Sequence, residues 1–477
     1  MAGERDIVSE STPRRPIDAA WASIPILLPA VVKLIDPMKA IDLAYHVRLG
    51  GLMLDSGSVI RSDALSFTAG GERWVDQQWL AQVLLASGHR LGGWAFLWML
   101  RAVLAAVSIG LIYLACRGAG RPAAVASGLA IAGFVVGYAN LGMRPQMLAV
   151  PLFAAALWAV VGRKDHPVRL ALLPVTALLV ANIHGSFPLI LLLGLLASAE
   201  DLIDRVPAWR RTAAWTGAAL VATFLTPFGA GTWAYVVEIS TDPQIRDSVT
   251  EWAPLRATDP SGALTIISVL AIAVWFGRRD RPVPWRSLVW LAVFLIPAFV
   301  TQRSIVWWAL VFPVVLAGLG GASRAARAPA RGESALPARV LIGTLMAAVV
   351  VALPWFRGIP DEQMLDDAPP GLTAAVREQI PYGTRLLVHQ PWASWFEYAT
   401  PGIPVFVDSR IELYPAAVWD AYDQIAFAGD GWAEALEAWD IEAIVAEADW
   451  ALLPRLRDDP GWRVVVEDED GTVLVRT

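Results

Sequence analysis

The sequence predicts an α-helical, polytopic membrane protein with about eleven spans, followed by a small C-terminal α/β domain. Three observations lead to this fold class. The chain of 477 residues is 56% hydrophobic and only 17% charged, whereas soluble domains are about one quarter charged. Its apolar runs approach the length of about 20 residues that crosses a bilayer. After about residue 357 these runs give way to short alternating segments of mixed polarity.

Eleven apolar runs define the predicted spans. They lie at about 17–35, 92–116, 122–142, 145–162, 169–183, 186–199, 213–226, 261–277, 286–300, 304–320 and 339–356. The two runs on either side of "ANIHGSF" leave an alternative open, because together they could form one broken helix or a re-entrant hairpin.

The distribution of basic residues predicts the orientation of these spans. With the N-terminus inside, the inner segments carry nineteen lysines and arginines, and the outer loops between spans carry nine. Five of those nine fall in one long loop, where the positive-inside rule is weak. The pattern therefore predicts a cytoplasmic N-terminus and an extracytoplasmic C-terminal segment.

This orientation divides the chain into three parts. We expect a cytoplasmic tail at 1–16, a transmembrane body at 17–357 with a large first outer loop at 36–91, and an extracytoplasmic α/β domain at 358–477. In the loop, "WVDQQWLAQVLLASGHRLGGW" is typical of an amphipathic helix in the membrane interface. In the C-terminal domain, "TRLLVHQ", "IPVFVDS", "IEAIVAE" and "WRVVVEDEDGTVLVRT" predict strands, with a hairpin turn at Asp470-Gly471. "DGWAEALEAW" and "DWALLPRLRDD" predict short helices.

Composition also narrows the function classes. The net charge of −6 gives no indication of a nucleic-acid partner, and the single Cys116 rules out an intramolecular disulfide framework. A transporter is disfavoured, because transporters tend to carry charges near the bilayer midplane and to show repeated halves. Here the unusual polar residues gather on the predicted outer face, and no repeat is evident.

The first outer loop supplies three candidate catalytic residues. Asp42 and His46 are four residues apart in a segment predicted to be helical from about Asp42 to Asp55, closed by Gly57, so they share one face. Asp42 could orient the imidazole or act as a general base, or it could simply cap the helix. Asp63 could be a second carboxylate of the site or the N-cap of the next turn, and the cap is favoured by its context.

Later outer segments add further candidates, each with a functional and a structural interpretation. Arg144, His184 and Arg303 could bind a phosphate, or serve as snorkelling or hydrogen-bonded residues at the membrane surface. Trp392 and Trp395 could form an aromatic edge for a glycan or belong to the core. For Asp408 and Arg410, a structural ion pair is favoured over catalysis. These ten positions are Asp42, His46, Asp63, Arg144, His184, Arg303, Trp392, Trp395, Asp408 and Arg410.

The segment "IDLAYHVRLGGLMLDSGSVIRSDALSFTAGGERWVDQQWLAQVLL" resembles the first extracytoplasmic loop of bacterial membrane proteins related to the GT-C glycosyltransferases. "RPQ", "NIHGSF", "TPFG", "TEWAP", the basic Arg303 and "VFVDSRIELYP" resemble later motifs of the same proteins, in the same order along nearly the whole chain. The chain departs from the pattern at Ile60-Arg61, where a proline is usual, and at Gln78, where glutamate is frequent. It also lacks an adjacent pair of acids around Asp42.

The resemblance implies a multi-pass protein of the bacterial cytoplasmic membrane that acts in the cell envelope. Such enzymes transfer a sugar from a polyprenyl-phosphate donor to a glycan, lipid or protein acceptor outside the cytoplasm. It implies Asp42 as the essential acid, with His46 and Asp63 in the same loop pattern, and Arg144, His184 and Arg303 facing the lipid phosphate. A divalent metal, Mg²⁺ or Mn²⁺, held by Asp42 and His46 is a further expectation. The alternative is a non-catalytic, glycolipid-binding or scaffold subunit derived from the same fold.

The predicted orientation can be tested with reporter fusions. Reporters placed after Arg331 and at Thr477 should report opposite sides of the membrane, because one predicted span separates the two positions. Activity of an alkaline phosphatase fusion marks the outer side, and fluorescence of a cytoplasmic reporter marks the inner side. Both fusions on one side would overturn the scheme.

Overall fold

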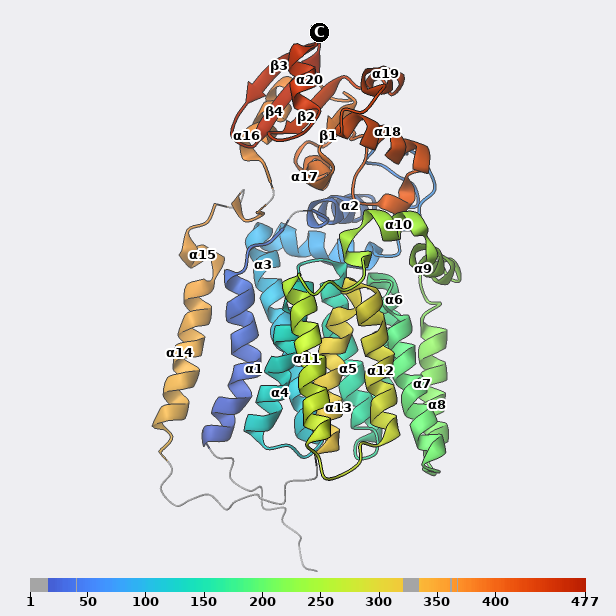
Figure 1. Ribbon diagram of the computed structural model, residues 1–477, viewed down its shortest axis with the longest axis vertical. Coiled ribbons are helices and arrows are strands. Elements are labelled where there is room, and N and C mark those ends of the chain that lie inside the picture. The colour runs from blue at the N-terminus through green and yellow to red at the C-terminus, as the bar shows by residue number, and fades with distance from the viewer. Residues whose placement is uncertain (1–15, 40, 321–333, 361–362, 367) are drawn as a thin grey trace, which may run out of the picture.

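The computed structural model describes residues 16–39, 41–320, 334–360, 363–366 and 368–477. A body of roughly parallel helices carries a small mixed sheet at one end, which we call the sheet end (Figure 1). Residues 1–15 of the predicted tail and residues 321–333 of the predicted inner linker lie outside the described residues.

Each of the eleven predicted apolar runs overlaps one helix of the body. These helices are α1 (Pro16–Ile35), α3 (Trp79–Gly118), α4 (Ala123–Gly137), α5 (Pro145–Val161), α6 (Leu172–Ile183), α7 (Pro188–Ile203), α8 (Trp209–Ala222), α11 (Pro260–Gly277), α12 (Trp285–Val300), α13 (Ile305–Leu319) and α14 (Leu336–Ala352). "ANIHGSF" joins two separate helices, α6 and α7. Within the described residues, five helices are long and apolar enough to cross a membrane, namely Pro16–Ile35, Trp79–Gly118, Ala123–Asn140, Pro260–Gly277 and Gln302–Leu319. The chain is thus a multi-pass membrane protein, and the number of eleven spans stays a prediction.

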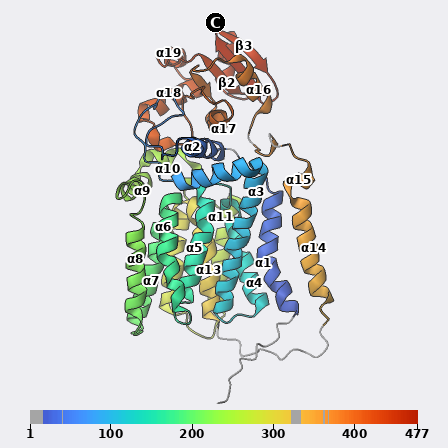
Figure 2. The same ribbon diagram turned by 180° about the vertical axis from the view of Figure 1, so that it is seen from behind.

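The first loop forms a platform over the sheet end of the body. Helix α2 (Leu43–Ser56) has the predicted bounds and is closed by Gly57 in a left-handed conformation, with φ at 66°. Helix α3 bends at Gly92 and Gly93, where Gly93 has a φ of 62°. Its first arm lies across the body and its second arm runs down through it (Figure 2), as the amphipathic pattern predicted. A Cβ on Gly50 would meet the Gln82 carbonyl oxygen at 2.0 Å, so glycine is needed where α2 packs on α3.

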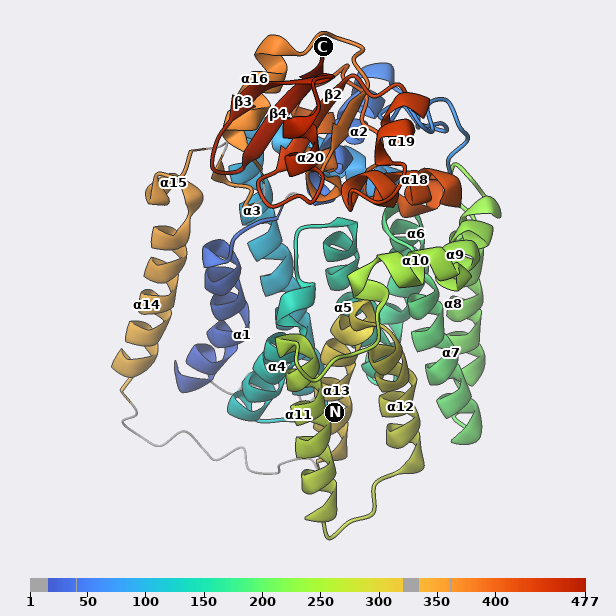
Figure 3. The same cartoon turned by 45° about the horizontal axis from the view of Figure 1, so that its top comes forward.

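Short elements from later loops complete the sheet end. They are η1 (Tyr138–Asn140), α9 (Gly231–Thr241), α10 (Pro243–Ser248), η3 (Thr250–Trp252), η4 (Gln302–Ser304) and α15 (Pro354–Arg357), while η2 (Pro167–Ala171) leads into α6. Figure 3 shows α9 and α10 running beneath the C-terminal elements and over the ends of the body helices. The loops at the sheet end therefore close around a common region rather than extend separately.

The C-terminal part has the predicted α/β character. Its elements are α16 (Pro370–Gln379), β1 (Leu386–Val388), α17 (Gln390–Ala399), η6 (Ile411–Leu413), α18 (Ala416–Ala426), α19 (Trp432–Ala438), β2 (Ala443–Glu447), α20 (Leu453–Asp458), β3 (Trp462–Glu467) and β4 (Gly471–Arg476). The sheet order is β1-β2-β4-β3, with β1 and β2 parallel and the other pairs antiparallel. The hairpin predicted at Asp470-Gly471 joins β3 to β4, where the Asp468 N–H donates to the Gly471 carbonyl at 2.9 Å.

The segment "IPVFVDS" is not the regular strand that its pattern predicted. Val405 makes only isolated bridges, to Leu386 of β1 and to Ser66 of the first loop. Pro404 has no N–H to donate, which prevents a continuous ladder at this point. The segment instead joins the first loop to the sheet, because the Phe67 N–H donates to the Val405 carbonyl at 3.1 Å.

A buried charge cluster fixes the same two parts of the chain to each other. The Arg410 side chain, 1% exposed, lies 2.7 Å from Asp63 Oδ1 of the first loop through Nη1. Its Nε donates to Asp408 Oδ2 at 2.9 Å, and the Tyr414 hydroxyl donates to the same oxygen at 2.7 Å. Glu397 of α17 lies 3.5 Å from Arg410 Nη2. We call Asp63, Glu397, Asp408 and Arg410 the charge cluster.

The cluster also shows what Asp63 does locally. Its carboxylate accepts from the backbone N–H of Leu65 at 3.2 Å and of Ser66 at 3.0 Å, and from the Ser66 hydroxyl at 2.7 Å. These are the bonds of a turn-capping aspartate. Asp63 therefore caps a turn and pairs with Arg410, in line with the capping alternative.

Protonation within the cluster is set by burial and by Arg410. Burial acts to raise the pKa of Asp408, but the Arg410 charge and its hydrogen bonds outweigh this and lower the pKa below its ordinary value. Burial and the neighbouring Asp408 charge raise the pKa of Glu397 well above its ordinary value, which favours the protonated carboxyl. Because the pKa of Asp408 is lower when folded, its stabilisation is present at neutral pH and is lost as the pH falls below about 4.

Replacement of Asp408 should destabilise the fold. Asp408→Asn removes the partner charge of a buried arginine, and breaking such a pair costs about 3 kcal/mol or more. We expect a lower melting temperature in a thermal-shift assay in detergent. The exposed Asp458 of α20 is the matched control, because Asp458→Asn should change stability by less than about 0.5 kcal/mol. An Asp408→Asn variant with wild-type melting but no activity would assign Asp408 to the chemistry instead.

Candidate functional site

A cavity of about 690 Å³ lies at the sheet end, between the body helices and the loops that join them there. Its apolar wall comes from α7, α9, α10, α12 and α13, and includes Leu189, Leu192, Val236, Ile239, Ile245, Val293, Phe294, Pro297 and Trp307. Its polar lining includes Asp42, Tyr45, His46, Arg144, Gln146, His184, Tyr235, Glu251, Arg303, Arg410 and Glu412. The cavity thus combines an apolar side with a charged side.

Five predicted site residues meet in this cavity although they are far apart in the sequence. They are Asp42, His46, Arg144, His184 and Arg303, and Arg410 of the charge cluster also reaches the lining. The cavity lining does not include Asp63, Trp392, Trp395 or Asp408. The first group comes together because its residues lie in loops at the sheet end. The second group is buried, either inside the C-terminal part or where that part contacts the first loop.

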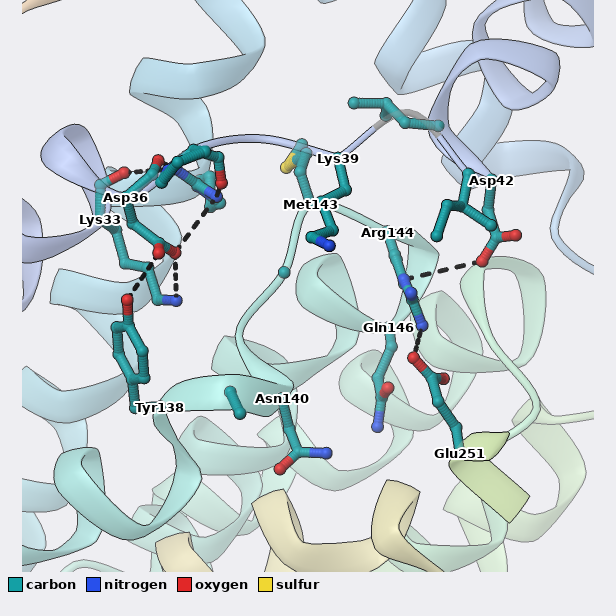
Figure 4. Close-up of a pocket in the computed structure, with 16 residues that line it drawn as sticks. Lys33, Asp36, Lys39, Asp42, Tyr138, Asn140, Met143, Arg144, Gln146 and Glu251 are labelled. Carbon is teal, nitrogen blue, oxygen red and sulfur yellow. Dashed lines mark hydrogen bonds and ion pairs between the residues drawn. The ribbon is translucent and has the colours of Figure 1, made fainter. Parts of the chain in front are cut away.

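Asp42 is positioned by α2 and by an arginine. It occupies the N-cap position of α2, but its side chain makes no capping hydrogen bond. Instead Asp42 Oδ2 lies 3.6 Å from Arg144 Nε, and Arg144 also pairs with Glu251 (Figure 4). Arg144 therefore bridges two carboxylates. The ion pair of Asp42 is with Arg144, and not with His46 as the helical spacing suggested.

His46 is a neutral group in this site. Burial lowers the pKa of His46 to about 3, with further lowering by the positive charges of Arg410, Arg144 and Arg303. Its Nδ1 is buried and makes no hydrogen bond to the described residues. His46 can therefore act as a neutral hydrogen-bonding group at physiological pH, but not as an acid.

His184 is also neutral, and its tautomer follows from its contacts. Burial lowers the pKa of His184 well below its ordinary value, and Arg303 and His46 add to this. The Ser186 backbone N–H donates to His184 Nδ1 at 3.2 Å, and the Ser186 hydroxyl lies 2.9 Å from the same nitrogen. Because Nδ1 accepts, the neutral ring carries its proton on Nε2, where it is a donor.

Arg303 is an arginine of the cavity for which the described residues provide no carboxylate partner. It belongs to η4, directly before α13, and its Nε is buried without a hydrogen-bond partner among the described residues. The guanidinium lies 5.7 Å from the centre of the Trp252 ring, a cation–π contact. An uncompensated positive charge beside an apolar wall is suited to an anion that carries a lipid.

Two carboxylates of the site were not singled out from the sequence. Glu251 lies in "TEWAP" and Glu412 in "VDSRIELYP", so both stood inside quoted motifs. Glu412 accepts from the Tyr235 hydroxyl at 2.7 Å and from Trp74 Nε1 at 3.3 Å. Burial raises the pKa of Glu412 above its ordinary value. The only sequence signal for Glu251 and Glu412 was that each lies inside a quoted motif. Their partners come from distant segments, which the motifs do not reveal.

Trp392 and Trp395 belong to the core of the C-terminal part. Both lie on α17 and are at least nine-tenths buried. Trp395 Nε1 donates to Thr373 Oγ1 at 2.8 Å, and its ring lies 6.3 Å from that of Trp94. Of the two interpretations left open, the core position is the one that the structure supports.

The residues expected to hold a divalent metal do not form a fitting ligand set. Asp42 pairs with Arg144, and the surroundings of His46 are positive. In the part of the chain that the structure describes, no three His, Cys, Asp or Glu side chains converge as metal ligands. We therefore derive no step through a metal.

No protein-family model matches the sequence, and a comparison with curated proteins finds no match. Solved structures do match. ArnT from Cupriavidus metallidurans, bound to undecaprenyl phosphate, is similar with a TM-score of 0.54, 13% identity and 97% of each chain covered. The oligosaccharyltransferase AglB from Archaeoglobus fulgidus, in complex with an inhibitory peptide and a dolichol-phosphate, gives a TM-score of 0.55 and 13% identity, over 96% of this chain and 74% of that chain.

A third similar structure is the arabinofuranosyltransferase AftD from mycobacteria. The TM-score is 0.53 at 18% identity, and the match covers 96% of this chain but only 38% of that chain. Identities this low establish likeness of fold, and the likeness extends over nearly all of the present chain. The chain therefore has the fold of the GT-C glycosyltransferases, as the resemblance in its sequence predicted.

Proposed function

We propose that this protein is a glycosyltransferase of the bacterial cytoplasmic membrane that moves a sugar from a polyprenyl-phosphate donor to an extracytoplasmic glycan, lipid or protein acceptor. The observation that carries the proposal is the large cavity, whose lining combines Arg303, which has no carboxylate partner among the described residues, with Asp42 and an apolar wall. A lipid-linked phosphate needs a positive charge next to an apolar surface, and a reacting hydroxyl needs a nearby carboxylate.

The donor would lie along the apolar wall with its phosphate at Arg303. The wall formed by α7, α9, α12 and α13 matches the isoprenoid chain in polarity, since it is lined by leucine, valine, phenylalanine and tryptophan. Arg303 supplies the positive charge, and the Nε2–H of His184 supplies a neutral donor to a phosphate oxygen. The structural neighbours ArnT and AglB were solved with undecaprenyl phosphate and a dolichol-phosphate, respectively, which supports this class of ligand.

The transfer step follows from the position of Asp42. Its carboxylate takes the proton from the acceptor hydroxyl, and the hydroxyl oxygen forms a bond to the anomeric carbon of the sugar. The bond between that carbon and the donor phosphate oxygen breaks, so polyprenyl phosphate leaves with the bonding electrons. Arg303 stabilises the charge that develops on the phosphate. Attack opposite the leaving group inverts the configuration at the anomeric carbon.

A non-catalytic glycolipid-binding or scaffold protein is the alternative, and one contact favours it. Arg144 already bridges Asp42 and Glu251, so Asp42 has a structural partner in the unliganded site. In that case the cavity would bind the lipid-linked sugar without turnover. Replacement of Asp42 separates the two functions.

Asp42→Asn should lower the transfer rate by at least about 100-fold, because it removes a general base without changing the size of the side chain. The fold should be retained, since Arg144 keeps Glu251 as its partner. The rate is measured as transfer from a labelled polyprenyl-phosphate sugar in nanodiscs. Asp55→Asn, at the far end of the same helix, is the control and should retain activity. Full activity of Asp42→Asn would remove the base from the mechanism. If the wild-type protein binds the glycolipid tightly but transfers sugar from no donor, the scaffold function is favoured.

Arg303→Ala should weaken binding of undecaprenyl phosphate by about tenfold or more, because a charge-assisted contact to phosphate is lost. The matched control is Arg256→Ala, since Arg256 is an exposed arginine that does not line the cavity. Affinities are measured directly on the full chain in nanodiscs. If both variants bind with the affinity of the wild type, Arg303 is not part of a phosphate site.

A further inference from the structure

A second, smaller cavity of about 220 Å³ lies beside the first (Figure 4). It is lined by the end of α1, the loop that follows it, α3, η1 and the start of α5. The lining residues used below are Lys33, Asp36, Lys39, Arg101, Asn140 and Arg144, and Asp42 and Glu251 also belong to the lining. Asp42, Arg144 and Glu251 line both cavities, so the Arg144 bridge stands between them.

The carboxylates of the small cavity are already bound by its cations. Lys33 Nζ lies 2.9 Å from Asp36 Oδ2, and Arg101 Nη1 lies 3.5 Å from the same oxygen. The Tyr138 hydroxyl donates to Asp36 Oδ1 at 2.5 Å. Asp36 is therefore saturated by three donors, Lys33, Arg101 and Tyr138.

Lys39 is the cation of this cavity without a described carboxylate partner. Four cations, Lys33, Lys39, Arg101 and Arg144, face three carboxylates, Asp36, Asp42 and Glu251. Lys33 and Arg101 share Asp36, while Arg144 takes the other two. In the described residues, Lys39 is exposed and has no ion pair. The cavity therefore has an excess of one positive charge, located at Lys39.

The choice of lysine here is selective. The chain contains only three lysines, Lys33, Lys39 and Lys164, among 38 basic residues, and two of the three line this one cavity. Arginine serves elsewhere in the chain as the general surface cation. Lysine presents a compact charge with three rotatable donors, which binds a phosphate as a point charge.

Buried polar atoms give an independent indication of a ligand. Arg101 is 2% exposed, and its Nε makes no hydrogen bond to the described residues. Asn140 donates through Nδ2 to the Gln302 carbonyl at 3.1 Å, but its Oδ1 is buried and makes no hydrogen bond to the described residues. Such atoms are costly to leave unsatisfied. Two residues of the cavity lining thus carry an unsatisfied donor and an unsatisfied acceptor.

We propose that the small cavity is the acceptor subsite, and that it binds an acceptor through a phosphate group held at Lys39. This inference rests on the proposed function, because it takes Asp42 as the base that both substrates share. The volume of about 220 Å³ is below the range of about 300–1,000 Å³ of ordinary ligand pockets. The space therefore suits one phosphate-bearing headgroup and excludes the lipid-linked donor.

The arrangement explains how the acceptor hydroxyl would reach the base. A phosphate at Lys39 anchors the headgroup, and Asn140 and Arg101 offer an acceptor and a donor to its polar atoms. A hydroxyl of the same headgroup then faces Asp42, which lines both cavities and so meets the hydroxyl where the donor sugar is within reach. The bonds made and broken are those of the transfer described above, and the phosphate of the acceptor is unchanged.

The test measures two ligands on the full chain in phosphatidylcholine nanodiscs. Glycerol 1-phosphate, followed by ³¹P NMR relaxation, probes the small cavity, and undecaprenyl phosphate probes the large one. Lys39→Gln should weaken glycerol 1-phosphate by about tenfold or more and leave undecaprenyl phosphate unchanged. Lys164→Gln is the matched control, since Lys164 lies outside both cavities and pairs with Asp204 at 3.7 Å. It should affect neither ligand.

The outcomes separate this inference from the proposed function. Absence of glycerol 1-phosphate binding, or equal binding by wild type and Lys39→Gln, would overturn the subsite while the donor proposal stands. If the wild type binds glycerol 1-phosphate but not undecaprenyl phosphate, the donor proposal fails and the phosphate site at Lys39 stands. In nanodiscs that contain phosphatidylglycerol, competition with glycerol 1-phosphate identifies a lipid headgroup as the source. Binding without competition identifies a soluble phosphate ester, and either result supports the site. Glycerol binding as tightly as its phosphate ester would contradict it.

Discussion

The buried Arg410 is the interaction on which the arrangement of this protein depends. A guanidinium with 1% exposure is tolerated only where carboxylates and hydrogen bonds compensate it. Its partners come from two places: Asp63 lies in the first loop, whereas Asp408 and Glu397 lie in the C-terminal part. More than 300 residues separate Asp63 from Glu397 and Asp408, so satisfying one charge brings the first loop and the C-terminal part together over the same end of the body. The large cavity lies beneath this junction, and Arg410 itself reaches its lining.

This constraint explains why the polar residues gather at one end of an otherwise apolar molecule. Loops that end body helices supply Arg144, His184 and Arg303, while α2 supplies Asp42 and His46. None of these segments could close a cavity alone. The junction covers them, and burial then changes their chemistry, since His46 and His184 remain neutral and the positive charge is left to arginine. The site thus results from packing between segments more than from any local motif.

The sequence predicted what depends on local patterns. Apolar runs located the body helices, and the spacing from Asp42 to Gly57 gave α2 almost residue by residue. Five candidate residues were expected on one face of the molecule because they lie in loops between predicted spans, and they do line one cavity. They are Asp42, His46, Arg144, His184 and Arg303. Contacts between distant segments were not predictable: the partner of Asp42 proved to be Arg144 rather than His46, and Glu251 gained its significance only from that arginine. The irregular course at 403–409 had a local signal in Pro404, but its pairing with Ser66 of the first loop is a distant contact that a strand pattern cannot reveal. The number of membrane crossings stays open, since several body helices are shorter than a bilayer is thick.

The shared position of Arg144 has a thermodynamic consequence for the two cavities. Arg144 lines both cavities and pairs with two carboxylates that also line both. It cannot move toward an anion in one cavity without changing the electrostatic potential in the other. Occupancy of the cavities is then coupled, and the coupling free energy is the same in either direction. A ligand that draws the guanidinium away from Asp42 leaves that carboxylate unneutralised toward the opposite cavity. If Asp42 is the base of the proposed transfer, its pairing with Arg144 in the unliganded site keeps its charge neutralised, which would limit reaction of the donor with water.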